Sequence, residues 1–544
     1  MTAPSQPDGT AGRRRQLLRL LLVLTVAAVA GCTGGGGPDR SGGSSGSSGG
    51  GGAPQGRRGG TLSIALLDPG PLDPARAEGL EDEVVLGNLF DGLTAVDPSG
   101  AVRPSVAASW TSGPDLRRWE FRLRPEARWS DGSPVHATDF TYAWQRLADP
   151  KTSPRPPVAA RTLLSGVTGY RAFAAGKARR ITGLETPDPA TLVVRLDHPF
   201  ADLPALVAAL PLSPLPAAQV RRDPAAYLRQ PAGNGPFRLA GPARPGRPLT
   251  LDRNPGFWGT PALLDQVSVH VTPDEQTAWL ELQNGRVAFA PVPPDQLAAA
   301  RTLYGESSDG RSAPGLLQGP TRTTWNLTFN LKSKLGRDAR WRQAVSLAID
   351  RDRLAATLAG TPAATLVPPV VPGFAGGAPA CPACTHDPAK ARALLAKVKG
   401  ARDPVTVAIP ADADARRVAT RLTADLAAAG IKASASPTPG ATPEGGTALT
   451  LVRGFAPYPR PDPYLAGPFT LSPDARRLLD QARATPDDPA RTARYQQAEA
   501  AILTDLPATP LVTEHHAAVL IPGPQGIDLT PWNTLDLAAV SLPA

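Results

Sequence analysis

Cysteine, charged residues and long hydrophobic runs are all scarce in this 544-residue chain. It has three cysteines and 19% charged residues, and its N-terminal apolar run, Leu20 to Ala30, is eleven residues long. A helix that crosses a bilayer needs about 20 apolar residues, so this run is too short to span one. The formal net charge is +9, but no Lys/Arg block interleaves with aromatic residues. A nucleic-acid partner is therefore not indicated.

The motifs of common enzyme classes are missing as well. Outside the Gly/Ser-rich segment 33–58, the chain has no Gly-x-Ser-x-Gly, and it has no His-Glu-x-x-His and no Walker loop. His515 and His516 are the one tempting cluster, but adjacent residues of a strand point to opposite faces and do not form a natural metal pair. We therefore expect that the protein is not an enzyme and that it binds neither a cofactor nor a metal ion.

The first 32 residues have the layout of an export signal. Arg13, Arg14 and Arg15 precede the apolar run, and Val29-Ala30-Gly31-Cys32 follows. This order of charged, apolar and small residues is typical of a secretory signal peptide. The cysteine after Ala-Gly resembles the bacterial lipobox, in which that cysteine is lipidated. We expect residues 1–32 to be a lipoprotein signal peptide and Cys32 to anchor the mature protein at the extracytoplasmic face of the cell membrane.

Residues 33–58 are rich in glycine and serine and nearly free of apolar residues. Such a segment cannot bury a core, and we predict a flexible tether with a reach of roughly 25–30 Å.

The remaining chain is too long for one compact core, so two or more domains are expected. Leu62, Ile64 and Leu66 alternate as in a half-buried strand, and Trp119, Phe121 and Leu123 repeat the pattern. Thr138 and Asp139 can cap a helix. Farther on, the segments 405–409 and 431–433 flank a helical pattern, which predicts a β-α-β unit. These patterns predict a chain with both α-helices and β-strands.

Several motifs resemble one known family. They are Asn-Leu-Phe-Asp-Gly-Leu at 88–93, Pro-Ser-Val-Ala-Ala-Ser-Trp at 104–110, Trp-Ser-Asp-Gly-Ser-Pro-Val at 129–135, Arg-Asn-Pro-Gly-Phe-Trp-Gly at 253–259 and Arg-Gln-Ala-Val-Ser-Leu-Ala-Ile-Asp-Arg at 342–351. This set resembles the family 5 extracellular solute-binding proteins, the peptide-, nickel- and oligosaccharide-type receptors of ABC importers. The resemblance begins near Gly59 and covers most of the chain.

The resemblance implies a two-lobed periplasmic-binding-protein-like α/β fold with a hinge and an extra α+β subdomain. On this basis we assign 59–75, 183–272 and 507–544 to lobe I, 76–182 to the extra subdomain and 273–506 to lobe II.

The pair Cys381 and Cys384 forms a lone C-x-x-C. Half a zinc site, with His386 nearby, and a redox pair are both conceivable. Because a second C-x-x-C or His pair is absent and the protein is exported, we favour a structural disulfide. It would close a very short loop, so its contribution to stability should be small.

The resemblance also places a ligand loop at 453–465, where relatives carry an acid that holds the ligand's ammonium. Here that position is Pro459, so either Asp462 substitutes or the ligand has no ammonium there. Arg453 and Arg460 would suit a carboxylate or phosphate instead, or are solvated loop charges. Trp325 and Phe455 are aromatic candidates, although Trp325 fits a core strand equally. The candidate ligand residues are Trp325, Arg453, Phe455, Tyr458, Arg460 and Asp462.

The function that the resemblance implies is capture of a small solute, a peptide first of all, by closure of the lobes. Its partners would be the ligand, an ABC permease with its ATPase, and the membrane through the lipid anchor. We expect a monomer. The alternative is an envelope lipoprotein of the same fold without a transport role, which binds a glycolipid or protein in cell-envelope assembly.

Overall fold

The computed structural model describes residues 58–77, 79–152, 158–244, 246–376, 381–438, 448–532 and 534–543. The predicted signal peptide, Cys32 and nearly all of the predicted tether lie outside these ranges. In the parts described, no helix has both the length and the hydrophobicity to span a membrane.

One mixed sheet of eleven strands runs through the described residues, in the order β15-β14-β16-β12-β17-β11-β1-β10-β9-β8, with β13 paired to β17 beside this path. Its strands are β1 Thr61–Leu67, β8 Phe237–Leu239, β9 Leu249–Arg253, β10 Gln266–Thr272, β11 Phe289–Pro291, β12 Gly315–Phe329, β13 Thr361–Pro362, β14 Val405–Ile409, β15 Ala433–Pro437, β16 Leu449–Phe455 and β17 Ala508–Leu520.

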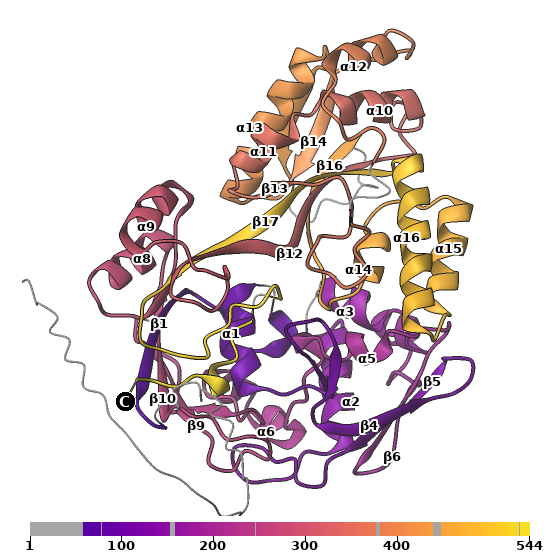
Figure 1. Ribbon diagram of the computed structural model, residues 1–544. Helices are drawn as coiled ribbons and strands as arrows, with labels where there is room; N and C mark the ends of the chain where they lie inside the picture. The colour runs from indigo at the N-terminus through magenta and orange to yellow at the C-terminus, as the bar shows by residue number, and fades with distance from the viewer. Residues whose placement is uncertain are drawn as a thin grey trace, which may run out of the picture. The chain divides into compact units, whose positions relative to one another are not determined.

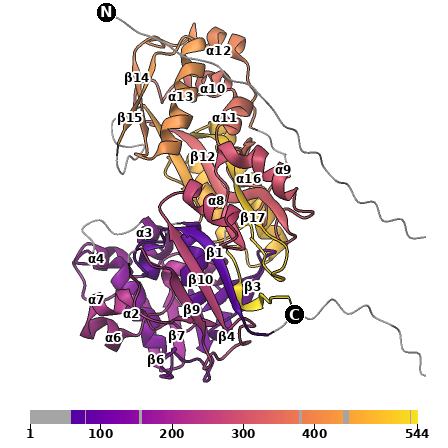
Figure 2. The same ribbon diagram turned by 90° about the vertical axis from the view of Figure 1, so that its left-hand side faces the viewer.

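The two longest strands, β12 and β17, pair antiparallel and connect two hydrophobic cores (Figure 1). At one end Leu317 of β12 and Leu520 of β17 belong to the core that includes Ile64 and Phe121. At the other end Trp325 and Leu327 belong to a core that includes Trp341. We call the elements around the first core the first lobe and those around the second core the second lobe. The view turned by 90° also shows β12 and β17 between them (Figure 2).

The first lobe holds the N-terminal part of the chain and the C-terminal segment after β17. A four-stranded sheet, β4-β5-β7-β6, and the β2–β3 hairpin belong to it. Its additional elements are β2 Thr94–Val96, β3 Val102–Pro104, β4 Ala107–Ser112, β5 Arg118–Leu123, β6 Leu184–Asp188, β7 Thr191–Arg195, η1 Pro74–Arg76, α1 Leu80–Leu89, α2 Ala137–Ala148, α3 Val158–Leu164, α4 Tyr170–Ala174, α5 Leu203–Leu206, η2 Leu210–Leu212, α6 Ala217–Arg222, α7 Pro224–Arg229 and η4 Leu537–Ala539.

The second lobe contains the predicted β-α-β unit, since β14 and β15 are parallel and α13 lies between them in the chain. Its helices are α10 Ala339–Ala348, α11 Arg351–Ala356, α12 Pro388–Leu395, α13 Ala413–Ala428, α14 Asp462–Leu465, α15 Pro473–Arg483 and α16 Asp488–Asp505. Six of these begin after an aspartate, as at Asp412 and Asp487, or a serine whose side chain accepts a backbone N–H of the first turn, which is the preferred helix start.

A third, smaller core joins α8 Glu275–Gln283, η3 Pro294–Gln296 and α9 Leu297–Tyr304 to the sheet. Trp279 of α8 packs with Ala65 of β1 and Val519 of β17. Helices α8 and α9, which follow the predicted boundary at 272, thus pack beside first-lobe strands. The four-stranded sheet continues past the predicted boundary at 182, to residue 195. The predicted boundaries at 182 and 272 stay predictions.

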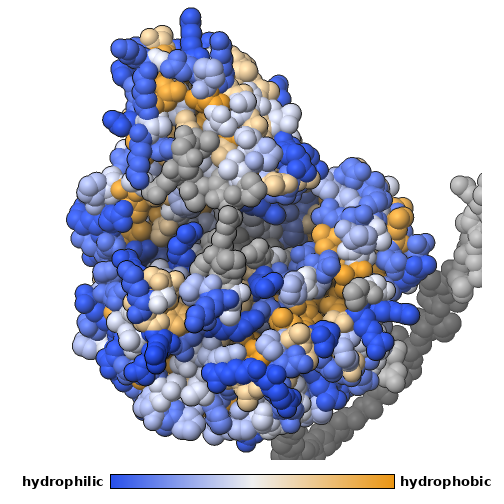
Figure 3. All heavy atoms as spheres, turned by 180° about the vertical axis from the view of Figure 1, so that it is seen from behind, coloured by the Kyte–Doolittle hydropathy of each residue, from blue (hydrophilic) through white to orange (hydrophobic). Residues whose placement is uncertain are grey.

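Most large hydrophobic side chains lie inside these cores. In the described part of the chain, Leu280 on α8 and Leu303 on α9 are the large hydrophobic residues that are exposed. On the face turned away from the view of Figure 1, hydrophobic groups lie among hydrophilic stretches (Figure 3).

The turn into α2 shows how local sequence sets these elements. We predicted a helix capped at Thr138 and Asp139, and α2 begins one residue earlier, at Ala137. The Asp139 carboxylate accepts the backbone N–H of His136 at 2.9 Å. Asp139 therefore closes the first turn from inside the helix instead of preceding it.

Candidate functional site

A cavity of about 740 Å³ lies where the first lobe meets the loop after β16. Its walls come from α1 and the residues after it, from the segments 208–213, 257–263 and 532–539, and from Arg322 and 457–459. Tyr458 packs in the first core and Trp532 in the second, so the lining includes residues of both. Drug-sized ligands occupy protein cavities of roughly 300–1,000 Å³, so this volume suits a small molecule or a short peptide.

The charged lining consists of three carboxylates and one guanidinium: Glu83, Asp91, Asp536 and Arg322. Arg322 Nη2 donates to Glu83 Oε1 at 2.8 Å, and both side chains are largely buried. Burial, reinforced by the nearby charge of Asp536, raises the pKa of Asp91 to about 7.

The backbone beside Asp91 is held rigidly. Asn234 accepts the N–H of Asp91 at 3.0 Å and donates to its carbonyl at 3.0 Å. Gly233 lies so close to the end of α1 that an added Cβ would be 1.9 Å from the carbonyl oxygen of Leu89. Glycine is therefore required there, which explains the Gly-Asn-Gly turn of the sequence.

Aromatic side chains cover much of the remaining wall: Phe90, Phe257, Trp258, Tyr458 and Trp532. Phe257 and Trp258 have ring centroids 5.3 Å apart. The Trp258 indole nitrogen is buried and has no hydrogen-bond partner among the described residues. Broad rings of this kind cover a ligand at a small cost in side-chain entropy.

The six candidate ligand residues separate into four groups. Tyr458 lines the cavity, as does Pro459, the residue at which the resemblance led us to expect an acid. Arg460 lines a second cavity of about 180 Å³. Trp325, Arg453 and Asp462 line neither cavity. Phe455 pairs with Thr323 in the sheet, and its side chain lies outside the described set.

Asp462 is already engaged by protein groups. It is buried, accepts Arg483 Nε at 2.6 Å and accepts the Tyr458 hydroxyl at 3.1 Å. Asp462 therefore has no accessible oxygen for a ligand ammonium unless these bonds break.

Arg460 joins a buried cluster between the lobes. Asp202, at the start of α5, accepts Arg460 Nε at 3.3 Å, Arg491 Nε at 3.0 Å and the Tyr495 hydroxyl at 2.8 Å. The Asp202 side chain is 1% exposed. Arg460 also donates to the carbonyl of Gly100 at 2.9 Å. Arg460 is thus a contact between lobes, not a solvated loop charge.

Trp325 and Arg453 meet at Glu514 on β17. Trp325 is completely buried, and its indole nitrogen donates to Glu514 Oε1 at 2.5 Å. Arg453 binds both oxygens of Glu514 at 2.7 and 2.8 Å. Trp325 therefore occupies a core position, which the alternating pattern of its strand had also allowed.

The two histidines lie apart from any metal-binding group, since the described residues contain no set of three His, Cys, Asp or Glu that could hold a metal ion. Burial lowers the pKa of His516 to about 4.

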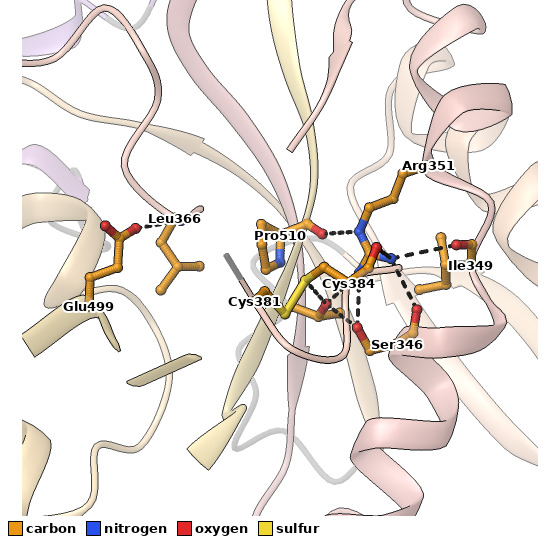
Figure 4. The surroundings of a disulfide bond; sticks show 9 residues. Ser346, Ile349, Arg351, Leu366, Cys381, Cys384, Glu499 and Pro510 are labelled. Carbon is orange, nitrogen blue, oxygen red and sulfur yellow. Dashed lines mark hydrogen bonds between the residues drawn. A yellow bond between two sulfur atoms is a disulfide. The ribbon is translucent and has the colours of Figure 1, made fainter. Parts of the chain in front are cut away.

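Cys381 and Cys384 form a disulfide beside the buried Arg351 (Figure 4). Arg351 donates to the carbonyls of Cys384 and Pro510 at 2.9 and 2.8 Å. Burial lowers the pKa of Arg351 to about 9. Arg351 thereby connects the short disulfide loop to β17, and neither cysteine lines the large cavity.

Sequence reasoning did not select Asp91, Arg322, Trp258 or Asp536. Asp91 and Trp258 stand inside two of the quoted motifs, at 88–93 and 253–259, which we used only for recognition. Arg322 and Asp536 carried no motif, and only the fold brings them to the cavity.

Comparison with known proteins places this architecture. The chain matches the bacterial extracellular solute-binding proteins, family 5 Middle, over residues 101–475. It is 32% identical over 327 residues to the periplasmic murein peptide-binding protein MppA of Escherichia coli K12, and 31% identical over 314 residues to the probable deoxycholate-binding periplasmic protein YgiS of the same strain. Each match covers 56% of this chain and 56% of the relative, so the chain spans about half the length of these curated relatives.

The fold is similar to the crystal structure of Haemophilus influenzae OppA in complex with RPPGFSPFR. The TM-score is 0.69 at 22% identity, over 90% of this chain and all of that one. This likeness confirms the predicted two-lobed periplasmic-binding-protein-like α/β fold. Because the family match covers more than half of the sequence, the chain belongs to the family 5 bacterial extracellular solute-binding proteins.

Proposed function

We propose that this protein is the substrate-binding receptor of an ABC importer and that it captures an oligopeptide by closure of its lobes. This chain belongs to family 5. The observation that carries the proposal is the 740 Å³ cavity, whose lining comes from both sides of the crossing strands β12 and β17. Arg322 and 457–459 face first-lobe residues across it, so the cavity changes shape when the lobes move.

Peptide is the first ligand class for two reasons. The related MppA and the similar OppA structure are a peptide-binding protein and a peptide complex by name. In addition, the aromatic lining of the cavity offers broad surfaces rather than one narrow polar pocket. Such a surface tolerates different side chains.

The membrane tether belongs to the same proposal. A lipidated Cys32 and a flexible segment would keep the binding lobes close to a permease at the extracytoplasmic face. The protein would act as a monomer and release its ligand unchanged. Replacing Cys32 with serine should move the protein from the membrane fraction to the soluble fraction.

A peptide-retention assay tests the proposal. The full chain is incubated with a random library of tri- to pentapeptides, separated from free peptide by gel filtration and assayed by mass spectrometry. We expect peptide to be retained. Ala95→Trp, at an exposed cavity residue, should reduce retention at least tenfold.

The matched control is Ala427→Trp, at an exposed position of α13 away from the cavity, which should retain peptide normally. Failure to retain any peptide, or recovery of a lipid or glycan as the bound species, would overturn the peptide assignment.

A further inference from the structure

We propose that Asp91 and Asp536 form a cation subsite in the first-lobe wall of the cavity, which takes an ammonium or guanidinium group of the ligand. This inference rests on the proposed function, because it concerns the same cavity. It assigns the charged end of the ligand to the first lobe instead of the loop at 453–465.

The first argument is charge. The chain is basic overall, at +9, but its cavity has three carboxylates against one guanidinium. That guanidinium, Arg322, is bound to Glu83. For the Asp91 carboxylate no donor is found among the described residues, and Asp536 accepts the backbone N–H of Ala538 at 3.0 Å. Two carboxylates that line the cavity therefore have no cationic partner among the described residues.

The second argument is that the fold holds together the backbone segments that carry these two carboxylates. Asn88 donates to the carbonyl of Leu535 at 2.8 Å and accepts the N–H of Leu537 at 3.1 Å. Asn88 is buried, so these bonds fix the segment carrying Asp536 beside the end of α1. Asn234 fixes the backbone of Asp91 from the other side.

Placing two like charges together costs free energy unless a cation or a proton compensates. Burial is the main reason that the pKa of Asp91 rises to about 7, and the charge of Asp536 adds to it. A ligand cation between the two carboxylates would replace the proton and gain charge-assisted hydrogen bonds.

The third argument concerns the alternatives for a ligand ammonium. On the loop, Pro459 has no charge, and Asp462 is bound to Arg483 and Tyr458. The cavity lining also offers the rings of Phe257, Trp258 and Trp532. Aromatic faces attract cations, so these rings would support a cation held by Asp91.

The test uses the full chain and two matched pairs of probes. The first pair is the random tri- to pentapeptide library with free N-termini and the same library N-acetylated, mixed in equal amounts. The second pair is the alkylamines from butylamine to octylamine and the corresponding alcohols. Their binding is measured as thermal stabilisation of the protein at neutral pH.

We expect free-amine peptides to be enriched at least tenfold over acetylated ones, and alkylamines to stabilise the protein more than alcohols. Asp91→Asn and Asp536→Asn should abolish both preferences while keeping the backbone contacts. Asp295→Asn, at an exposed position outside the cavity, should keep both.

The outcomes separate the two proposals. Equal retention of both libraries together with equal effects of amines and alcohols would overturn the cation subsite and leave a peptide receptor. If no peptide is retained but the amine preference persists and depends on Asp91, the subsite stands and the peptide assignment fails. Unchanged preferences in both asparagine variants would also overturn the subsite.

Discussion

At the scale of single residues, this protein buries two ionisable groups, Arg351 and Glu499, that have no oppositely charged partner among the described residues. Arg351 is completely enclosed and is satisfied by carbonyl and hydroxyl oxygens. Glu499 is 1% exposed, and its Oε1 accepts the backbone N–H groups of Leu366 and Val367 at 2.8 and 2.9 Å. Burial raises the pKa of Glu499 to about 7. Each of these two side chains forms hydrogen bonds with several backbone groups and so holds different segments of the main chain together.

The raised pKa of Glu499 makes a prediction about stability. Between its unfolded value near pH 4.5 and about pH 7, the folded state binds a proton that the unfolded state has lost, so the free energy of unfolding falls as pH rises. Glu499→Gln keeps Oε1 as the acceptor of both N–H groups and removes the charge. The variant should match the wild type near pH 4.5 and exceed it at pH 8, by up to about 3 kcal/mol.

Urea denaturation at both pH values measures this difference. Glu306→Gln, at an exposed carboxylate paired with Arg301, serves as the control and should follow the wild type. His516 changes stability in an overlapping pH range, but its contribution cancels in the comparison of variants. A Glu499→Gln protein with the wild-type pH profile would contradict the prediction.

At the scale of elements, the crossing strands are linked by side chains as well as by backbone pairing. Glu514 on β17 accepts Trp325 from β12 and Arg453 from β16, so one carboxylate connects three neighbouring strands. The Arg453 guanidinium also lies 5.9 Å from the centre of the Trp325 ring. This connection lies close to the point where β12 and β17 change register, between Pro320 and Thr324.

Glu514→Ala should lower the free energy of unfolding by about 1–3 kcal/mol, because the buried indole N–H of Trp325 loses its acceptor. Glu514→Gln can still accept that N–H and loses only the ion pair with the half-exposed Arg453. Its loss should stay below about 1 kcal/mol. Chemical denaturation of the three proteins tests the order. Equal losses in both variants would show that the ion pair, not the indole bond, stabilises the strands.

At the scale of the whole binding unit, the Asp202 cluster connects the lobes. Asp202 belongs to the first lobe, whereas Arg491 and Tyr495 belong to α16 of the second. Opening of the cavity by movement of the lobes would expose these groups or exchange their partners. The cluster therefore stabilises the arrangement in which the lobes are together.

Tyr495→Phe removes one hydrogen bond to Asp202 without emptying space in the core. A hydrogen bond to a charged group is worth about 1.5–3 kcal/mol, so the lobes should open more often. Small-angle X-ray scattering should show a larger radius of gyration than for the wild type. Tyr227→Phe, which removes a hydroxyl inside the first lobe, is the control and should leave the curve unchanged. Identical curves for Tyr495→Phe and wild type would exclude this role.

The sequence alone determined the local elements and the family. Alternating apolar residues predicted strands such as β1 and β5, because this signal acts within a few residues. The predicted cap at Thr138 and Asp139 lies inside α2, which begins at Ala137. The motifs at 88–93, 253–259 and 342–351 were enough to predict the two-lobed fold. The sequence also pointed to Tyr458 and Pro459, which line the cavity.

The tertiary structure alone decided which charges are free. In the sequence, Asp462 and Arg460 are simply charged loop residues. In the structure, Asp462 pairs with Arg483 and Arg460 pairs with Asp202, and each partner is more than twenty positions away. Asp91 and Asp536 are 445 positions apart in the chain, and Asn88 brings them to one wall. Pairing of charges depends on contacts between distant segments, and no local pattern records those contacts. The family could therefore be recognised from motifs, while the charge available to a ligand could be identified only in the folded chain.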